Sequence, residues 1–514
     1  MTKKLILCVA MLTAVLSLST WAAGSQDTTA SAAEPATVTV MVAERGTAAQ
    51  NLEAPVYTYI MEESGVNIDF EIVPSSDWNA KKRTIIATDD VPDIISVGLG
   101  DVLDFADAGV FQPLNDMIDK KMPNLKALLQ LKENQNVWKT AIDGTLYAFP
   151  TLKHYEFHRG IISVIRVDTL KTLGLEMPKS FDELYDVLSA IKEDDPNAHV
   201  WTTRGGSNNV LRNMAYAWGT GHEIYFDQDL DKYVYGSVTS RYKDLLAYVS
   251  RAYNDGLLDP DYVSVTTQQW REKLGSGKSY FFFDNPTYGK RSNDAIVNVN
   301  PDGWFEPTPV LENPYGGRRA LFYDRIVWGG WAIGAHSENE DAVAQLLDYM
   351  YSDEGAILKT FGVEGDHYER VGSEYQYKLD VLEPYKNPTG GYKIDAIVTD
   401  IGIGGYGDFN PYIDMRLYRL TWPEYQIAWY EKMEQDPAWS DPISDPPLNA
   451  SERESLADLR TKVQTILQQG IDKVILGDMT IDEWDGVVED AKKAGALEIE
   501  KIYNDAQRRF EAGR

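Results

Sequence analysis

Short apolar runs alternate with amphipathic stretches through the first hundred residues of the chain. Apolar positions over residues 38–42, 66–73 and 91–97 predict strands. Between them, residues 56–64 and 78–88 place apolar side chains at helical spacing and predict helices. Strands that alternate with helices in this way are typical of an α/β layer built on a mostly parallel sheet.

A second α/β unit is predicted to begin between residues 154 and 167. Residues 161–165 predict a strand, and the helix after it is expected to end at Gly174. Ser180 and Glu183 have the spacing of a capping box, which predicts the start of another helix. Further helices are predicted at 240–255, 340–352, 451–469, 480–494 and 497–512, and further strands at 280–283 and 328–334.

The first 24 residues have the features of an export signal. Lys3 and Lys4 precede an apolar run at 5–18, and small residues follow at 20–25. The run is shorter than the ~20 apolar residues that span a bilayer. We therefore expect a cleaved signal peptide at 1–24, rather than an uncleaved anchor, followed by a disordered tether at 25–37.

The single cysteine, Cys8, lies inside this predicted signal. A mature chain without it has no thiol, which excludes disulfides, thiolate catalysis and cysteine-ligated metals. Cys8 also comes too early to be a lipidated first residue. The expected location is therefore the periplasm, with the protein freely soluble and carrying no lipid anchor.

Composition narrows the classes of partner. The 514 residues carry a formal net charge of −30, a field that repels nucleic acid and anionic lipid. There are 13 Trp and 30 Tyr but only 15 Phe. Because Trp and Tyr combine an apolar ring with a polar group, this excess favours half-wet binding surfaces.

Several short motifs resemble chemical sites but lack a required feature. Residues 275–279 read Gly-Ser-Gly-Lys-Ser, yet Glu272 replaces the first glycine of a phosphate-binding loop and a strand follows where a helix is needed. The glycine-rich residues 402–407 lack the dinucleotide-binding spacing. His154 and His158 lack the zinc-protease pattern, and no Gly-x-Ser-x-Gly motif occurs. We therefore expect no enzyme, no cofactor and no metal site.

Four stretches together are similar to a known family. They are Val91-Pro92-Asp93-Ile94-Ile95, residues 143–147 with Pro150, residues 329–333 with 342–368, and residues 482–503. With them the chain resembles the oligosaccharide-type extracellular solute-binding proteins of ABC importers, in particular the LplA-like and alginate-binding branch.

The resemblance implies two α/β lobes that close by a hinge on a ligand bound in the cleft between them. The N-terminal lobe would comprise 38–154 and 325–395, and the C-terminal lobe 155–324 and 396–514. The implied function is to capture a carbohydrate and deliver it to membrane permeases. The expected ligand is an oligosaccharide, either neutral or acidic, and the receptor is expected to be a monomer. A peptide receptor of the same fold and an exported polysaccharide lyase or hydrolase remain as alternatives.

One departure from the family concerns calcium. Relatives carry an acidic, glycine-containing calcium loop, but here Asp195-Pro196-Asn197 is followed by Ala198 and His199. Too few oxygen ligands remain for this hard cation, so no calcium is expected there. Asp227, Asp229 and Asp231 also lack the glycine and the final acid of a calcium loop and predict a hairpin tip.

Sugar rings stack on aromatic faces, and their edges accept and donate hydrogen bonds. Arg45 follows the first strand, and relatives that bind acidic sugars use an arginine near this point. Asn285 follows the strand at 280–283, and Tyr147 precedes the first crossover between the units. The remaining candidate ligand-binding residues are aromatic: Trp78, Trp218, Trp304, Trp328, Trp331 and Tyr406.

Overall fold

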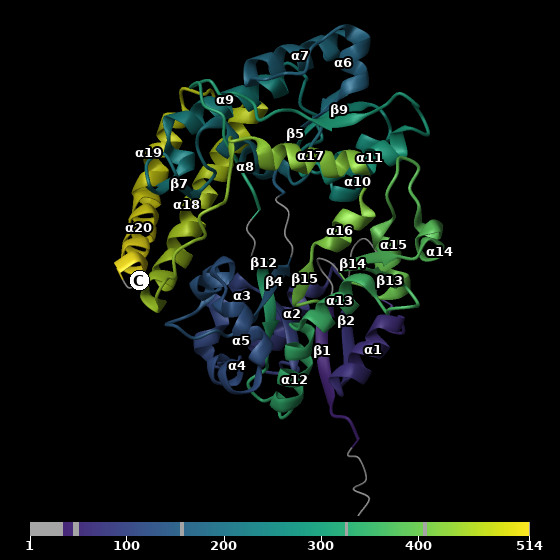
Figure 1. Ribbon diagram of the computed structural model, residues 1–514. Helices are drawn as coiled ribbons and strands as arrows, with labels where there is room; N and C mark the ends of the chain where they lie inside the picture. The colour runs from purple at the N-terminus through teal and green to yellow at the C-terminus, as the bar shows by residue number, and fades with distance from the viewer. Residues whose placement is uncertain (1–33, 45–50, 155–158, 324–326, 405–408, 513–514) are drawn as a thin grey trace, which may run out of the picture. The chain divides into compact units, whose positions relative to one another are not determined.

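The computed structural model describes residues 34–514 except 45–50, 155–158, 324–326, 405–408 and 513–514 (Figure 1). Its strands form two main sheets. The six-stranded sheet has the order β15 (Tyr412–Asp414), β4 (Phe149–His154), β12 (Val327–Ala332), β3 (Ile94–Gly98), β1 (Thr37–Ala43) and β2 (Asn67–Val73). The four-stranded sheet has the order β10 (Phe305–Pro307), β5 (Ile162–Arg166), β9 (Ser279–Asp284) and β6 (His199–Trp201).

The parallel pairing predicted for the first strands is confirmed. β1 pairs in parallel with both β2 and β3, with Val40 opposite both Phe70 and Ile94. The second sheet, for which the sequence predicts no strand direction, is mostly antiparallel, because β5 pairs antiparallel with both β9 and β10. The predicted hairpin tip is also confirmed, because β7 (Ile224–Asp227) and β8 (Lys232–Tyr235) pair antiparallel around it.

Helices pack around each sheet. Those whose side chains share cores with the six-stranded sheet are α1 (Pro55–Ser64), α2 (Trp78–Ala87), α3 (Leu99–Phe105), α4 (Asn115–Lys121), α5 (Pro123–Gln130), α12 (Glu340–Met350), α13 (Asp353–Phe361) and α15 (Ile394–Ile401). Those in the cores of the four-stranded sheet include α6 (Val167–Leu173), α7 (Phe181–Asp194), α8 (Gly206–Trp218), α9 (Ser240–Asn254), α10 (Thr267–Gly275), α11 (Thr287–Ile296) and α17 (Glu424–Gln435). The same core takes in the C-terminal helices α18 (Ala450–Leu476), α19 (Trp484–Ala494) and α20 (Ala496–Ala512), drawn in yellow in Figure 1.

Short elements complete the chain. They are the strand pairs β11 (Ala320–Leu321) with β16 (Trp439–Ser440) and β13 (Tyr368–Val371) with β14 (Glu374–Tyr377), the helices α14 (Leu379–Leu382) and α16 (Arg416–Thr421), and the 3₁₀ turns η1 (Ala106–Ala108), η2 (Lys132–Thr140), η3 (Gly236–Val238) and η4 (Glu383–Tyr385). β15 joins the six-stranded sheet through β4, although the sequence assigns residues 396–514 to the C-terminal lobe. The lobe boundaries themselves stay a prediction.

Local sequence explains where the helices begin and end. The Ser180 hydroxyl accepts a hydrogen bond from the Glu183 amide at 3.1 Å, and the Glu183 carboxylate accepts one from the Lys179 amide at 2.7 Å. α7 therefore begins at the predicted residue with Ser180 as its cap, but the Glu183 carboxylate binds the amide of Lys179 and not that of Ser180, so the capping box is incomplete. Gly174 ends α6 with a φ of 68°, a left-handed conformation that glycine adopts without steric cost.

Asp93 links strands that are far apart in the sequence. Its carboxylate accepts hydrogen bonds from the Thr39 amide and hydroxyl, both at 2.9 Å, and from the Ser337 hydroxyl at 2.5 Å. Asn339 adds a donor at 3.2 Å. Burial raises the pKa of Asp93, but these hydrogen bonds outweigh burial and hold the pKa below its usual value.

Replacing Asp93 with asparagine is expected to destabilise the fold most at neutral pH. The lowered pKa means that the ionised carboxylate stabilises the folded chain fully above its unfolded-state pKa, and that this stabilisation is lost as pH falls through the folded pKa. We expect Asp93→Asn to lower the free energy of unfolding by about 1–3 kcal/mol at pH 7 and by less at pH 3. Urea unfolding at both pH values tests this, with the exposed Asp69→Asn as control; an equal loss at both would contradict it.

Candidate binding pocket

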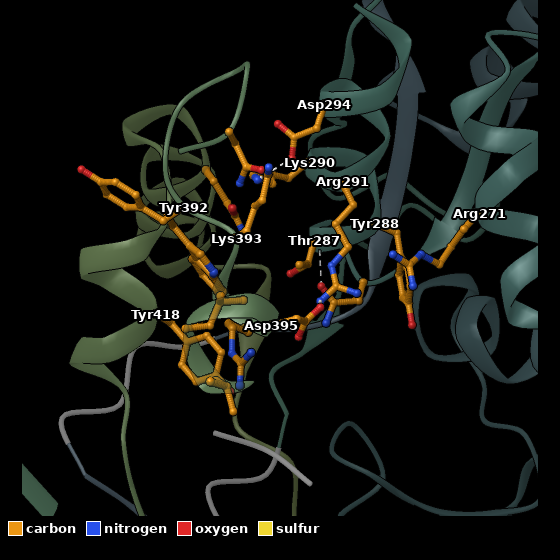
Figure 2. A pocket seen from close by; sticks show the side chains of 17 residues that line it. Arg271, Thr287, Tyr288, Lys290, Arg291, Asp294, Tyr392, Lys393, Asp395 and Tyr418 are labelled. Carbon is orange, nitrogen blue, oxygen red and sulfur yellow. Dashed lines mark hydrogen bonds and ion pairs between the residues drawn. The ribbon is translucent and has the colours of Figure 1, made fainter. Parts of the chain in front are cut away.

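A pocket of about 440 Å³ is lined by residues of α10, α11, α15, α16 and α17, together with Arg159, Asn285, Asn387, Tyr392, Lys393 and Trp422 (Figure 2). In the figure, Tyr392, Lys393 and Tyr418 lie on one side and Tyr288, Lys290 and Arg291 on the other. α11 belongs to a core of the four-stranded sheet, whereas α15 belongs to that of the six-stranded sheet. The pocket is therefore built by elements of both sheets.

The turn between β9 and α11 positions one wall of the pocket. The Asn285 side-chain oxygen accepts a hydrogen bond from the Thr287 amide at 2.9 Å, and the Asn285 amide donates to Asp284 at 2.7 Å. Asp284 is buried and accepts hydrogen bonds from Arg204 at 3.0 and 3.3 Å. This bidentate pair fixes the end of β9, so the first turn of α11 begins at a defined place.

Cations outnumber carboxylates around the pocket. It is lined by five cations, Arg159, Arg271, Lys290, Arg291 and Lys393, but by only two carboxylates, Asp294 and Asp395. This local excess contrasts with the net charge of −30 for the whole chain. A pocket of this kind attracts an anion, even though the protein as a whole repels one.

Only part of this positive charge is neutralised within the protein. Lys290 Nζ lies 2.5 Å from Asp294, and Arg291 Nη2 lies 3.5 Å from Asp395. Burial lowers the pKa of Lys290, which the neighbouring Asp294 partly offsets. Among the described residues, Arg271 and Lys393 make no ion pair. The Arg271 guanidinium and the Lys393 ammonium are therefore available to a ligand.

Contacts around Asp294 and Asp395 connect the two sides of the pocket. Thr389 donates a hydrogen bond to Asp294 and also lies 3.2 Å from the Tyr425 hydroxyl. Together with the Arg291–Asp395 pair, this joins α11 to the segment that leads into α15.

One residue that lines the pocket carries a buried amide. Gln426 is fully buried, and neither its Nε2 nor its Oε1 has a hydrogen-bond partner among the described residues. The Arg159 guanidinium lies 5.4 Å from the Tyr418 ring and 5.9 Å from the Trp422 ring. An amide buried without partners is costly, so a ligand that supplies hydroxyl groups gains by satisfying it.

One of the predicted site residues lines the pocket, and the others lie elsewhere or outside the described residues. Asn285 lines the pocket. Arg45 and Tyr406 lie outside the described residues, as does the side chain of Trp328. Tyr147 is half-buried against the core that contains β3 and does not line this pocket.

The tryptophans predicted as platforms are mostly engaged elsewhere. Trp218 is 3% exposed and packs against Phe181 and Tyr248 at 4.9 Å. Trp331 is buried against Phe409 at 4.8 Å, so both of these rings are core residues rather than surfaces open to a ligand. The half-buried Trp78 has Lys82 above its ring at 5.5 Å, outside the pocket.

Trp304 is also half-buried and lies outside the pocket lining. Its ring meets that of Tyr425 at 4.8 Å, and its backbone amide donates to Asp168 at 3.0 Å. Sequence reasoning missed Arg159, Arg291, Lys393, Trp422 and Gln426. No local signal identifies these residues, because Tyr418 lies on α16, Gln426 lies on α17, and Trp422 lies in the extended turn between the two helices.

The residues around Asp195 do not suit calcium. The Asp195 carboxylate accepts a hydrogen bond from the Asn197 amide at 3.1 Å, and Lys192 Nζ donates to the Ala198 carbonyl at 3.1 Å. A lysine ammonium thus occupies a loop oxygen that a cation would need. Among the residues that the structure describes, no cluster of three His, Cys, Asp or Glu side chains could hold a metal ion.

Residues 44–357 match the family model described as bacterial extracellular solute-binding protein. The chain belongs to this family. Within the described part of the chain, no helix combines the length and apolarity needed to cross a membrane.

Two curated relatives of this solute-binding protein are named for carbohydrates. The fructooligosaccharide ABC transporter substrate-binding protein FusA of Streptococcus pneumoniae is 29% identical over 329 residues, which are 59% of each chain. The polygalacturonan/rhamnogalacturonan-binding protein YtcQ of Bacillus subtilis is 23% identical over 464 residues, which are 86% of each chain. The match to FusA therefore covers less than two thirds of its length.

Solved structures share the architecture. The alginate-binding protein AlgQ2 without calcium ion superimposes with a TM-score of 0.77 at 22% identity, over 92% of this chain and 98% of AlgQ2. This likeness confirms the predicted two-lobe α/β fold of a periplasmic binding protein.

Proposed function

We propose that this solute-binding protein is the substrate-binding component of an ABC importer, and that it captures an oligosaccharide in the pocket around α11 and α15. The fully buried Gln426 amide, with both of its polar atoms unpaired, carries the proposal because it calls for a ligand that both donates and accepts hydrogen bonds. Sugar hydroxyls do both. The carbohydrate names of FusA and YtcQ support the same class of ligand.

The charge of the pocket favours an acidic oligosaccharide. Five cations face two carboxylates, and Arg271 and Lys393 have no ion pair among the described residues. A uronate carboxylate would form charge-assisted hydrogen bonds with these groups. Tyr418 on one side of the pocket and Tyr288 on the other supply ring surface for the apolar faces of the sugar.

The cellular setting is part of the same proposal. The signal at 1–24 would export the chain, and loss of Cys8 with it would leave a periplasmic, unlipidated monomer. The elements around the six-stranded sheet and those around the four-stranded sheet would move as two lobes about a hinge, and the liganded form would dock on the permease subunits. The ligand would be released unchanged, because the chain acts as a receptor and not as an enzyme.

Isothermal titration calorimetry with trigalacturonate, kestose and a tripeptide tests the ligand class. We expect the acidic trisaccharide to bind with a Kd on the order of micromolar, or about −8 kcal/mol. Prolonged incubation should leave the glycan intact by chromatography. Binding of the tripeptide alone would favour the alternative peptide receptor, and cleavage of the glycan would favour the lyase or hydrolase.

Replacing Gln426 with leucine is expected to affect stability and binding in opposite directions. Removing an unpaired buried amide should leave the free energy of unfolding unchanged or raise it, whereas the lost hydrogen bonds should weaken oligosaccharide binding about tenfold. Thermal unfolding and calorimetry measure the two effects. The exposed Gln435→Leu on the same helix is the control, and a loss of stability without loss of binding would show that Gln426 serves the fold.

A further inference from the structure

A second hollow, of about 610 Å³, lies between α8, α18 and the turn that precedes β7. It shares no lining residue with the pocket around α11 and α15. Side chains of α8 and α18 belong to one core. The floor of the hollow is thus fixed by the packing of these two helices.

Two polar side chains in the wall of this hollow are buried. Tyr235 is 1% exposed and lines the hollow. The side chain of His222 is 5% exposed; its Nδ1 lies 2.8 Å from the Tyr242 hydroxyl, while its Nε2 is 3.9 Å from Glu223, beyond hydrogen-bond distance. Burial lowers the pKa of His222 to about 3, so its imidazole is neutral at physiological pH.

The charges around the hollow balance. Arg212 contributes one positive charge; its guanidinium donates to Asn208 at 3.4 Å and makes no ion pair among the described residues. Glu223 contributes one negative charge and accepts a hydrogen bond from Gln464 at 3.2 Å. The first pocket, by contrast, has more cations than carboxylates, so the two sites suit ligands of different charge.

Glu223 is held in place before any ligand binds. Its φ of 60° is left-handed, which is unusual for a residue with a side chain. The Ser237 hydroxyl accepts a hydrogen bond from the Glu223 amide at 3.1 Å, and the Gly236 amide donates to the Glu223 carbonyl at 2.6 Å. The carboxylate therefore faces the hollow in a preorganised position.

We propose that this hollow is a second binding site, for one neutral sugar unit. Its lining combines a neutral imidazole, a phenol and the amides of Asn208, Gln464 and Gln468, groups that can donate or accept as sugar hydroxyls do. Balanced charge disfavours a free anion or cation. The inference goes beyond the proposed function, because it concerns a site with no residue in common with the first.

Titration of neutral methyl glycosides into a protein whose first pocket is weakened tests the second site. The probes are the methyl glycosides of glucose, galactose, mannose and xylose. Their binding to the Gln426→Leu protein is followed by saturation-transfer NMR. At least one should bind with a Kd on the order of millimolar, as expected for a single sugar unit. The double variant Tyr235→Phe/Gln464→Ala should weaken this binding about tenfold, because it removes two hydrogen-bonding groups and keeps the ring.

The Tyr262→Phe variant is the matched control, because Tyr262 is also a buried tyrosine but lies outside the hollow. It should leave glycoside binding unchanged. The proposal is overturned if none of the four glycosides binds, if Tyr235→Phe/Gln464→Ala has no effect, or if acetate or glycine binds in their place. Oligosaccharide binding to the Tyr235→Phe/Gln464→Ala protein reports on the first pocket separately, so the two proposals fail independently.

Discussion

Replacing Arg271 and Lys393 together with alanine is expected to weaken trigalacturonate binding about a hundredfold, if each cation contributes one charge-assisted hydrogen bond of about 1.5 kcal/mol. Kestose, which has no carboxylate, should bind within about twofold of the original affinity. Both side chains are exposed and make no ion pair among the described residues, so the fold should be unaffected. Calorimetry at low and high salt measures the loss and its screening.

A control for this variant removes the same charges elsewhere. Arg508 and Lys493 are exposed on α20 and α19, and the Arg508→Ala/Lys493→Ala protein has the same net charge as the pocket variant. It should bind trigalacturonate almost normally, because solvent and salt screen distant charges. An equal loss for trigalacturonate and kestose would mean that Arg271 and Lys393 shape the pocket without selecting acidic sugars.

Replacing Asp168 with alanine is expected to lower the free energy of unfolding by about 3–5 kcal/mol, because it leaves the buried Arg166 without its counter-charge. Arg166 is 2% exposed and donates to Asp168 through Nε at 2.7 Å and Nη2 at 2.6 Å. The Trp304 amide donates to the same carboxylate at 3.0 Å. One substitution therefore breaks the junction between β5, α6 and the segment before β10.

Chemical unfolding at neutral pH measures this effect, and two further variants interpret it. Asp302→Ala removes an exposed carboxylate from the same part of the chain and should change stability by less than about 0.5 kcal/mol. Asp168→Ala/Arg166→Met removes the stranded charge and should recover part of the loss. If Asp168→Ala were no more harmful than Asp302→Ala, the ion pair would contribute nothing to the fold.

The sequence predicts the local elements well because their signals are local. The apolar runs of β1, β2 and β3, the Ser180 cap of α7 and Gly174 at the end of α6 all lie within a few residues of the feature they specify. Strand direction in the second sheet was not predictable in this way. β5 pairs with β9 more than a hundred residues later, and no local pattern specifies that register.

The pocket was harder to predict for the same reason. Arg159, Arg291 and Lys393 lie on three separate segments that the fold brings together, whereas Asn285 could be found because it directly follows a recognisable strand. Aromatic content alone did not distinguish a binding ring from a core ring. Trp218 and Trp331 have the same side chain as Trp422, but packing decides which of them borders a cavity.

The contact between Arg291 and Asp395 has a consequence for how firmly the proposed acidic oligosaccharide would be held. The Arg291 guanidinium lies 3.5 Å from the Asp395 carboxylate, which competes with a ligand carboxylate for it. Binding of the ligand therefore exchanges one ionic partner of Arg291 for another. The net gain in binding free energy is the difference between the Arg291–ligand pair and the Arg291–Asp395 pair. This difference moderates affinity while it still favours a carboxylate over an uncharged group at that position. Under the proposed function, moderate affinity would help the protein to release its ligand, because the Arg291–Asp395 pair re-forms as the ligand leaves.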